Sequence, residues 1–390
     1  MAELAGNIRK YYAYQFLSSF QFYYPVFMIF FQSFSLSLAQ IGLFLTVYSV
    51  TTVLFDIPTG IVADFLGRRK TLLISGLLWV ASFSAFSIAT DYYGFAVAYA
   101  LVALGAAFAS GTDSSLLYDS LKALKREGEY KKILGSAGMA VNIAVVISFL
   151  AGGFLYTIGT RLPYILTTVT SILAIPLILS FVEPPREKPR GRKMIHLRES
   201  VLFVMKHPKV KWLTFLGTIT MTGVVISYFN NQAYLQRIGL APEQFGIILA
   251  VGMVITALIS NYAYKIEKKI GEKASLAIPP IAVAAAYLLT SQSSFMWAFV
   301  FLYLINFSRG FSGPVMSDYV NRHVASKNRA TVLSVQSSIS EISFAIFGPL
   351  AGYAADLWSI QTAFLMAGLL IAVVATPVLL FTIKAHGQKR

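Results

Sequence analysis

The sequence predicts an all-α, polytopic membrane protein with 12 transmembrane helices in two pseudo-symmetric six-helix bundles. Three observations predict this fold class. The 390-residue chain is 56% hydrophobic and 13% charged, with a mean hydropathy of +0.67, which is more apolar surface than an ordinary soluble core can bury. Apolar runs long enough to cross a ~30 Å hydrocarbon core recur along the chain, and the two halves of the sequence repeat each other.

The individual spans follow from hydropathy and from the charged turns between them. We place them at 11–33, 38–63, 70–90, 94–121, 131–158, 162–182, 210–236, 243–264, 274–291, 295–320, 330–355 and 358–383. Residues 1–8 are short and mixed, and the first apolar run is too long for a signal-peptide core, so we expect no cleavable signal.

The basic residues predict the orientation of the chain. With the N- and C-termini cytoplasmic, the cytoplasmic segments hold every lysine and arginine except Arg161, Arg237 and Arg309. The positive-inside rule requires this bias. The net charge of +15 is spread over every second loop and does not form one face, so we expect no nucleic acid partner. The expected location is the cell membrane, with the lipid bilayer as solvent.

An internal duplication divides the chain. An offset of 204 residues places five residues on identical ones, namely Tyr24, Gln32, Gln40, Gly42 and Gly67 on Tyr228, Gln236, Gln244, Gly246 and Gly271. An offset of 199 does the same for Phe108, Gly111, Asp119, Leu134 and Gly153 on Phe307, Gly310, Asp318, Leu333 and Gly352. We therefore expect an N-terminal bundle at 1–183, a cytoplasmic linker at 184–209 and a C-terminal bundle at 210–390. Repeated halves place a substrate site between them near the midplane.

The turn between the second and third spans is Gly60-Ile-Val-Ala-Asp64-Phe-Leu-Gly67-Arg68-Arg69-Lys70. Gly67 permits a tight bend, and the three basic residues favour an anionic cytoplasmic surface. The run resembles the signature turn between helices 2 and 3 of the major facilitator superfamily, the twelve-helix secondary transporters. Phe65 departs from the family, which usually has a basic residue there.

The resemblance implies a cytoplasmic gate built from Gly60, Asp64, Gly67, Arg68 and Asp119, in which the arginine lies between the two carboxylates. Asp119 lies at the cytoplasmic end of the fourth span, at the depth of this turn. In the other interpretation, Asp119 only balances the charge of Lys122 at a solvated helix end.

The second half predicts a weaker gate. There Asp318 with Arg322 would be the counterpart, because the turn 268–273 has lost the aspartate.

Charged residues inside the spans are candidates for a proton-coupling or cation site. They are Glu341, Asp113 and Asp56, and each would cost several kcal/mol facing lipid. Glu341 shares a polar helical stripe with Ser334, Ser337 and Ser338. Alternatives remain open: Asp56 as part of the gate, Asp113 as part of a packing seam, and Glu341 as a buried structural pair with Arg309.

Polar residues on the expected cavity walls are candidates for substrate binding. They are Ser18, Gln21, Tyr24, Asn142, Tyr228, Asn231, Arg309 and Ser337. Amides and phenols orient a ligand through hydrogen bonds. The run 228–232, Tyr-Phe-Asn-Asn-Gln, also predicts an unwound gate in the seventh span.

Several chemistries have no support in the sequence. There is no cysteine, and the four histidines, His196, His207, His323 and His386, have no partner at ligand spacing. We expect no metal and no cofactor. No nucleophile and base set suggests an enzyme.

The first function that we consider is a secondary active transporter working by alternating access, with proton-coupled export of a small amphipathic or cationic compound. An alternative is a uniporter, symporter or exchanger for an anionic metabolite anchored by Arg309, and a second is a non-transporting membrane receptor. The family's proton-driven drug exporters usually carry an arginine in the fourth helix, which 101–105 lacks, and a Gly-Pro motif in the fifth, where this chain has Ser148 to Gly153. Expected partners are a small-molecule substrate and protons, and we expect a monomer.

Overall fold

The computed structural model describes residues 2–185, 204–324 and 326–387. In this part of the chain the regular elements are all helices and there is no strand, which confirms the predicted all-α class. The helices form two compact units. The first holds the described residues of Met1–Phe34, Val47–Gly191 and Pro242–Ala250, and the second those of Ser35–Thr46, Arg192–Ala241 and Val251–Arg390.

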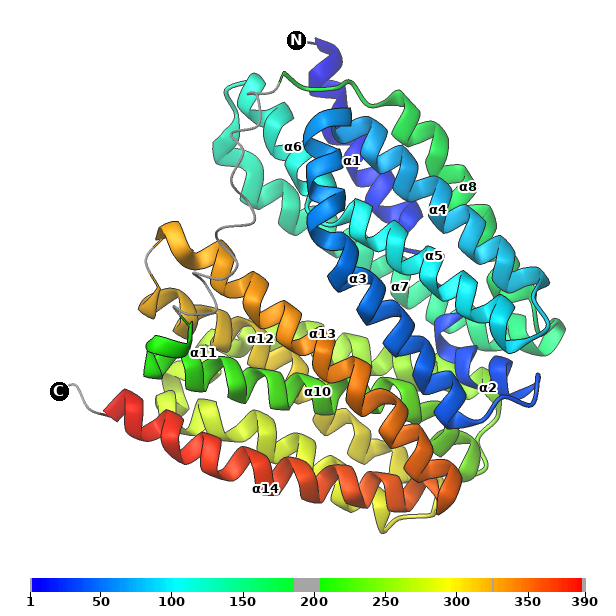
Figure 1. Cartoon of the computed structure of the whole chain (residues 1–390), viewed down its shortest axis with the longest axis vertical. Helices are drawn as coiled ribbons and strands as arrows, with labels where there is room; N and C mark the ends of the chain where they lie inside the picture. Colours follow the sequence, from blue (N-terminus) through cyan, green and yellow to red (C-terminus); the bar gives the residue numbers. More distant parts are fainter. Residues whose placement is uncertain (1, 186–203, 325, 388–390) are drawn as a thin grey trace. The chain divides into compact units, whose positions relative to one another are not determined.

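The first unit is built mainly from the helices of the N-terminal half. They are α1 (Ala2–Ser18), α2 (Phe27–Gln32), α3 (Leu38–Leu66), α4 (Arg68–Ile88), α5 (Tyr92–Ala109), α6 (Thr112–Ala123), α7 (Tyr130–Ile158) and α8 (Leu162–Ser180). α4 packs along both α5 and α8, and α1 packs against α7 and α8 (Figure 1). Apolar and aromatic side chains of α1, α4, α6, α7 and α8 form one buried cluster.

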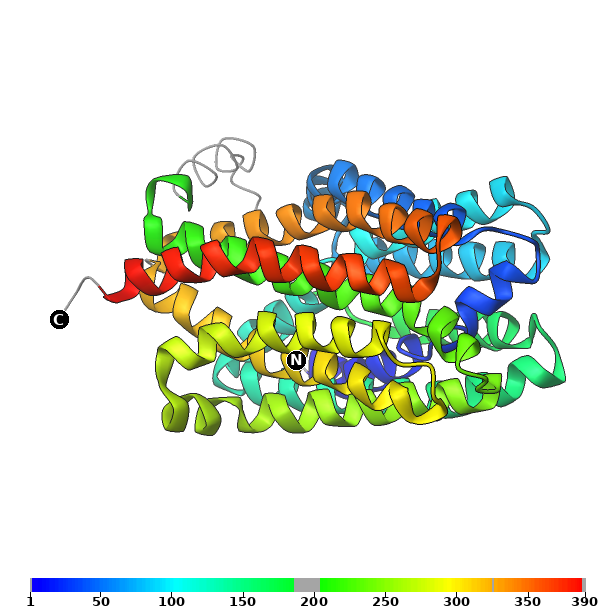
Figure 2. The same ribbon diagram turned by 90° about the horizontal axis from the view of Figure 1, so that it is seen from below.

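The second unit contains five long helices. They are α10 (Pro208–Arg237), α11 (Pro242–Ser291), α12 (Tyr303–His323), α13 (Ser326–Leu357) and α14 (Ile360–Gly387). α10 packs against α12, α13 and α14, and Figure 2 shows α14 running beside α13. α11 is two helices joined at Gly271, whose φ of 79° interrupts it. These two parts correspond to the predicted spans 243–264 and 274–291.

Eight helical segments among the described residues are long and apolar enough to cross a membrane. Because α11 counts once, they cover nine of the predicted spans. The other three are 11–33, 295–320 and 330–355. The structure breaks the first into α1 and α2, and it begins the second with a 3-10 helix, Met296–Leu302. α13 covers the third span, which carries the predicted polar stripe.

The first predicted span breaks close to Pro25. α1 ends at Ser18, and a 3-10 turn at Tyr24–Val26 precedes α2. Pro25 has no backbone N–H to donate and is disfavoured in a helix interior, so it suits this turn. The freed amide of Gln21 donates to Oγ of Ser148 on α7 at 3.1 Å. A side chain of α7 thus satisfies a backbone amide that the break leaves without a helical partner.

Two helix beginnings pack with the other half of the sequence. The start of α3 belongs to the second unit, where a Cβ on Gly42 would lie 2.7 Å from Cα of Pro349 on α13. The start of α11 belongs to the first unit, where a Cβ on Gly246 would lie 2.0 Å from the carbonyl oxygen of Phe149 on α7. Only glycine permits backbones this close, and these two glycines are equivalent in the repeat.

The expected linker, 184–209, lies largely outside the described residues, as does His196. The side chains of His323 and His386 are also outside them.

Candidate functional site

Asp113 is a half-buried carboxylate of the first unit. It lies in the first turn of α6, two residues after the positive-φ residue Gly111. Its Oδ2 accepts a hydrogen bond from Nε2 of Gln15 on α1 at 2.8 Å, and its Oδ1 accepts one from the amide of Ser114 at 2.6 Å. Neither partner is cationic, so no described side chain neutralises this carboxylate.

Gln15 connects Asp113 to an aromatic wall. Its side-chain nitrogen also donates to the hydroxyl of Tyr11 at 2.8 Å. Tyr11 and Tyr14 are 1% and 4% exposed and belong to the apolar cluster of the first unit. Asp113 therefore lies at the edge of an apolar region, where its environment can distinguish a charged from a neutral guest. Sequence analysis missed Gln15, although it shares a helix face with Tyr11.

Three predicted substrate residues lie near the break of the first span. Gln21 is held through its amide by Ser148, and the ring of Tyr24 stacks on Phe149 with centroids 5.0 Å apart and planes at 2°. Ser18 donates to the carbonyl of Tyr14 in its own helix at 2.7 Å. The structure thus brings Gln21 and Tyr24 against α7.

Two other predicted residues of the first unit are exposed. They are Asn142 on α7 and Asp56 on α3. Neither forms a described hydrogen bond with Asp113. The structure therefore does not join them to that carboxylate.

Arg309 on α12 is a half-buried cation of the second unit. Its guanidinium lies over the ring of Tyr228 on α10, 5.1 Å from the centroid, and Nη1 donates to the Tyr228 hydroxyl. The same nitrogen lies 3.8 Å from Sδ of Met253. These described partners include no carboxylate. The charge of Arg309 is thus oriented by an aromatic ring without being neutralised there.

The predicted unwound gate is wrong for this structure, because α10 is continuous from 208 to 237. Local hydrogen bonds support the helix here. Ser227 donates to Oδ1 of Asn231 at 2.7 Å, and Asn230 donates to the carbonyl of Ile226 at 3.0 Å. Asn231 is only 5% exposed, so its side chain is committed to α10.

Glu341 is half-buried on α13. It follows the predicted polar stripe, in which Ser338 is also half-buried, while the side chains of Ser334 and Ser337 lie outside those that the structure describes. The pairing of Glu341 with Arg309 remains a prediction.

The signature turn brings its charged residues together. α3 ends one residue before Gly67, whose φ of 103° allows α4 to begin at Arg68. Nη1 of Arg68 lies 3.4 Å from Oδ1 of Asp64, and Nε lies 3.5 Å from Oδ2 of Asp119 on α6. These three side chains are 20–25% exposed, so solvent screens the cluster only in part. Gly60 lies one helical turn before Asp64.

Sequence analysis missed a fourth member of this turn. Oε1 and Oε2 of Glu183 accept hydrogen bonds from the amides of Arg68 at 2.7 Å and Arg69 at 2.9 Å. A carboxylate at a helix N-terminus satisfies free amides and opposes the helix dipole. Glu183 comes directly before a Pro-Pro pair, which is the only local signal of a helix end.

The second half has a different network. Nη2 of Arg322 lies 2.5 Å from Oδ2 of Asp318, but both side chains are more than half exposed. The buried hydroxyl of Tyr319 donates to Oε1 of Glu267 on α11 at 2.9 Å. That hydrogen bond, which sequence analysis missed, joins α11 to α12. In the first half, the helices are joined instead by the ion pairs of Arg68.

A second carboxylate caps a helix from far along the chain. Oδ1 and Oδ2 of Asp356 at the end of α13 accept hydrogen bonds from the amides of Leu38 at 2.9 Å and Ala39 at 2.7 Å. Those amides begin α3. The cap lies beside Gly352, where a Cβ would be 2.3 Å from the carbonyl oxygen of Leu38.

The described residues contain no group of three or more His, Cys, Asp or Glu side chains arranged to hold a metal ion.

Comparison with known proteins agrees with this architecture. The family model for the Major Facilitator Superfamily matches residues 12–348 and 213–390. The uncharacterised MFS-type transporter YxaM of Bacillus subtilis is 20% identical over 92% of this chain and 90% of its own length. Multidrug resistance protein 2 of the same organism is 23% identical over 90% of this chain and 88% of its own.

The crystal structure of the nucleoside transporter NupG superimposes with a TM-score of 0.78 at 13% identity, covering 98% of this chain and 100% of that one. At this identity the similarity concerns the fold. The matches confirm the resemblance first seen in the turn 60–70, and they identify a multi-pass membrane transporter that is not an enzyme. The chain belongs to the Major Facilitator Superfamily.

Proposed function

We propose that this transporter exports a small amphipathic cation in exchange for protons, by alternating access between the bundles of residues 1–183 and 210–390. The observation that carries the proposal is the position of Asp113. It is a half-buried carboxylate that Gln15 orients and that no described cation neutralises. In a membrane such a group binds a proton or a cation, and competition between the two couples their movements.

The surroundings of Asp113 favour an amphipathic guest. Tyr11 and Tyr14 supply aromatic surface, and aromatic faces attract organic cations. Multidrug resistance protein 2, which is similar over nearly the whole chain, supports export as the direction. Glu341 and Asp56 are the next candidates for the proton site.

The cluster of Asp64, Arg68 and Asp119 serves this cycle as the cytoplasmic gate, with Gly60 and Gly67 allowing the tight turn. Asp318 and Arg322 form an exposed counterpart in the second half.

A second candidate function rests on Arg309, whose described partners include no carboxylate. Arginine binds carboxylates and phosphates through paired hydrogen bonds. Arg309 and Tyr228 would then anchor an anionic metabolite, with a proton as optional partner.

Measurement of substrate flux in proteoliposomes distinguishes the two proposed functions. We expect Asp113→Asn to abolish the accumulation of tetraphenylphosphonium that an imposed pH gradient drives. The matched control is Asp91→Asn, which makes the same chemical change at the exposed start of α5. If Asp113→Asn still accumulates the cation, Asp113 is not the coupling group. Uptake of benzoate that is lost in Arg309→Gln would favour the second function.

A further inference from the structure

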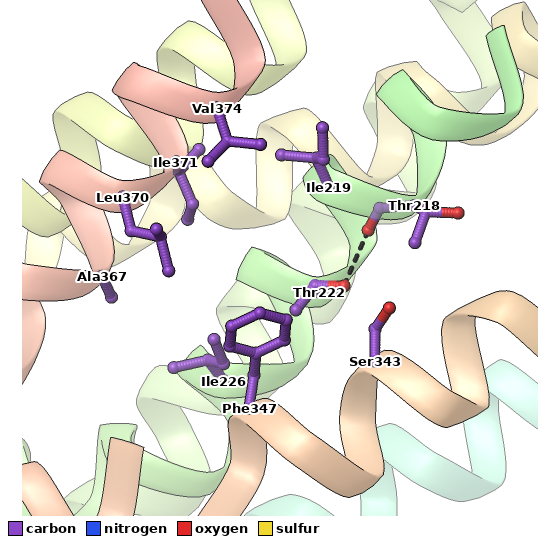
Figure 3. A pocket seen from close by; sticks show the side chains of 10 residues that line it. All are labelled: Thr218, Ile219, Thr222, Ile226, Ser343, Phe347, Ala367, Leu370, Ile371 and Val374. Atoms are coloured by element: carbon purple, nitrogen blue, oxygen red, sulfur yellow. Dashed lines mark hydrogen bonds between the residues drawn. The ribbon is translucent and has the colours of Figure 1, made fainter. Parts of the chain in front are cut away.

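The second unit contains an apolar slot between three helices. Its volume is about 130 Å³, and it is lined by Thr218, Ile219, Thr222 and Ile226 of α10, Ser343 and Phe347 of α13, and Ala367, Leu370, Ile371 and Val374 of α14. Figure 3 shows the α14 side chains facing α10, with the ring of Phe347 between them. An engineered apolar cavity of ~150 Å³ binds benzene, so this slot has room for part of a hydrocarbon chain.

The slot opens on the outer surface of the unit. Leu370 and Val374 line it and are 46% and 39% exposed. The exposed surface of a transmembrane helix in this zone meets lipid. Lipid chains can therefore reach the slot at these exposed side chains.

One polar atom in the slot has no partner. The Thr218 side chain is 6% exposed, and its hydroxyl has no hydrogen-bond partner among the described residues. Thr222, by contrast, donates to the carbonyl of Thr218 at 2.8 Å, the bond drawn in Figure 3. Ser343 similarly donates to the carbonyl of Ile339 at 2.9 Å. The Thr218 hydroxyl is itself buried, so the slot offers a guest an almost wholly apolar surface.

An aromatic and basic surface continues the slot toward one end of α10 and α14. Trp212, Ile219 and Ile226 recur every seven residues and thus share one face of α10. The ring of Trp212 stacks on Phe381 of α14, with centroids 4.9 Å apart and planes at 15°. Nζ of Lys211 lies over Trp212, 4.7 Å from its centroid. Trp212 precedes Ile219 by ~10 Å along the helix.

The charged residues that α10 and α14 contribute at this end are all positive. Lys209 and Lys211 begin α10, Lys384 lies near the end of α14, and neither helix contains an aspartate or glutamate. The positive-inside rule assigns this end to the cytoplasm, where anionic lipids attract lysine at ~1 kcal/mol each. Aromatic rings such as Trp212 and Phe381 suit the headgroup depth.

From the apolar slot and the basic end, we infer that α10 and α14 bind one anionic phospholipid. An acyl chain occupies the slot between Ile219 and Val374. The phosphate lies near Lys209, Lys211 and Lys384. Neither Asp113 nor Arg309 lines the slot.

Quenching of tryptophan fluorescence by brominated lipid tests the site. The protein has four tryptophans, and a variant with Trp79, Trp297 and Trp358 changed to Phe retains Trp212 alone. It is placed in phosphatidylcholine nanodiscs containing increasing fractions of phosphatidylglycerol with brominated chains. We expect quenching that saturates at a low fraction. A variant that retains only Trp297, which is 68% exposed, should show quenching proportional to the fraction.

Two further variants separate the headgroup from the chain. Lys209→Gln, Lys211→Gln and Lys384→Gln together should weaken saturable quenching on the order of 100-fold, by ~1 kcal/mol per lysine. The matched control neutralises Lys265, Lys268 and Lys269 of α11, and should not change it. Ala367→Phe fills the slot and should remove the saturable phase, whereas Leu369→Phe, on the exposed side of α14, should not.

Thermal unfolding checks that each variant is folded. Equal saturation with brominated phosphatidylcholine would overturn the anionic headgroup. Quenching of Trp212 that is merely proportional to lipid fraction, or unaltered by Ala367→Phe, would overturn the site itself.

Discussion

The carboxylate of Glu183 accepts a hydrogen bond from the backbone amide of Arg68 at 2.7 Å. Glu183, three residues after the end of α8, thereby caps α4, which begins 115 residues earlier in the chain beside the signature turn. The turn is thus held by ion pairs of Arg68 with Asp64 on α3 and Asp119 on α6, and by the cap from Glu183.

Removing this cap should cost stability. We expect Glu183→Ala to lower the free energy of unfolding by about 1 kcal/mol, the usual value of an N-cap, because two amides lose their acceptor. Glu127→Ala changes an exposed acid in a short 3-10 helix and should have little effect. Thermal unfolding in detergent compares the two. Equal midpoints would show that the cap contributes nothing.

Asp64→Asn should change the balance of conformations and not the affinity for substrate. Arg68 would retain Asp119 but lose the charge of Asp64, and a difference of about 1 kcal/mol shifts a two-state equilibrium roughly fivefold. The natural chain has no cysteine, so single introduced cysteines report the accessibility of each face.

The control for this change is Glu129→Gln. It breaks the ion pair of Arg126 and Glu129, whose side chains are both 44% exposed, and it should leave the labelling pattern unchanged. A pattern in Asp64→Asn that matches the natural protein would reject the gate.

Asp356 and Asp91 both cap helices, but Asp91 caps its own helix and Asp356 caps one that is distant in the sequence. Asp91 accepts from the amide of Gly94 in its own helix at 2.7 Å, whereas Asp356 caps α3 from α13. We expect Asp356→Ala and Asp91→Ala to lose similar stability, about 1 kcal/mol each. Only Asp356→Ala should also alter cysteine labelling, because it releases α3 from α13. Identical labelling in both variants would contradict a conformational role for Asp356.

The crossing glycines should not tolerate a methyl group. Gly42→Ala and Gly246→Ala place Cβ 2.7 Å from Pro349 Cα and 2.0 Å from the Phe149 carbonyl oxygen, so backbones must separate. Both should lose stability and alter labelling. Gly135→Ala meets nothing within 4 Å and should gain about 1 kcal/mol through helix propensity. A stable, fully active Gly246→Ala protein would show that the contact is not needed.

Parts of this structure could be predicted from composition and repetition. Hydropathy placed the spans, since lipid requires long apolar helices, and the repeat singled out Gly42 and Gly246. It did not reveal their contacts, because Gly42 meets a helix about 300 residues later. The break at Pro25 had a signal in the sequence, yet a continuous span was expected there.

Hydrogen bonds between distant side chains were harder to foresee. Gln15 reaches Asp113 across 98 residues, and Glu183 reaches Arg68 across 115. Neither pair has a spacing rule, because the packing of the helices sets the distance. The Asp64 and Arg68 pair, by contrast, is local at i, i+4, and a motif could identify it.

The cap on α3 also has a consequence for folding during synthesis. Asp356 follows Leu38 by 318 residues, so at about 5 to 20 residues per second the ribosome delivers it ~15 to 60 s later. During that interval the first turn of α3 must rely on water or headgroups for its hydrogen bonds. A nascent chain that stalls before α13 therefore lacks the acceptor for the amides of Leu38 and Ala39.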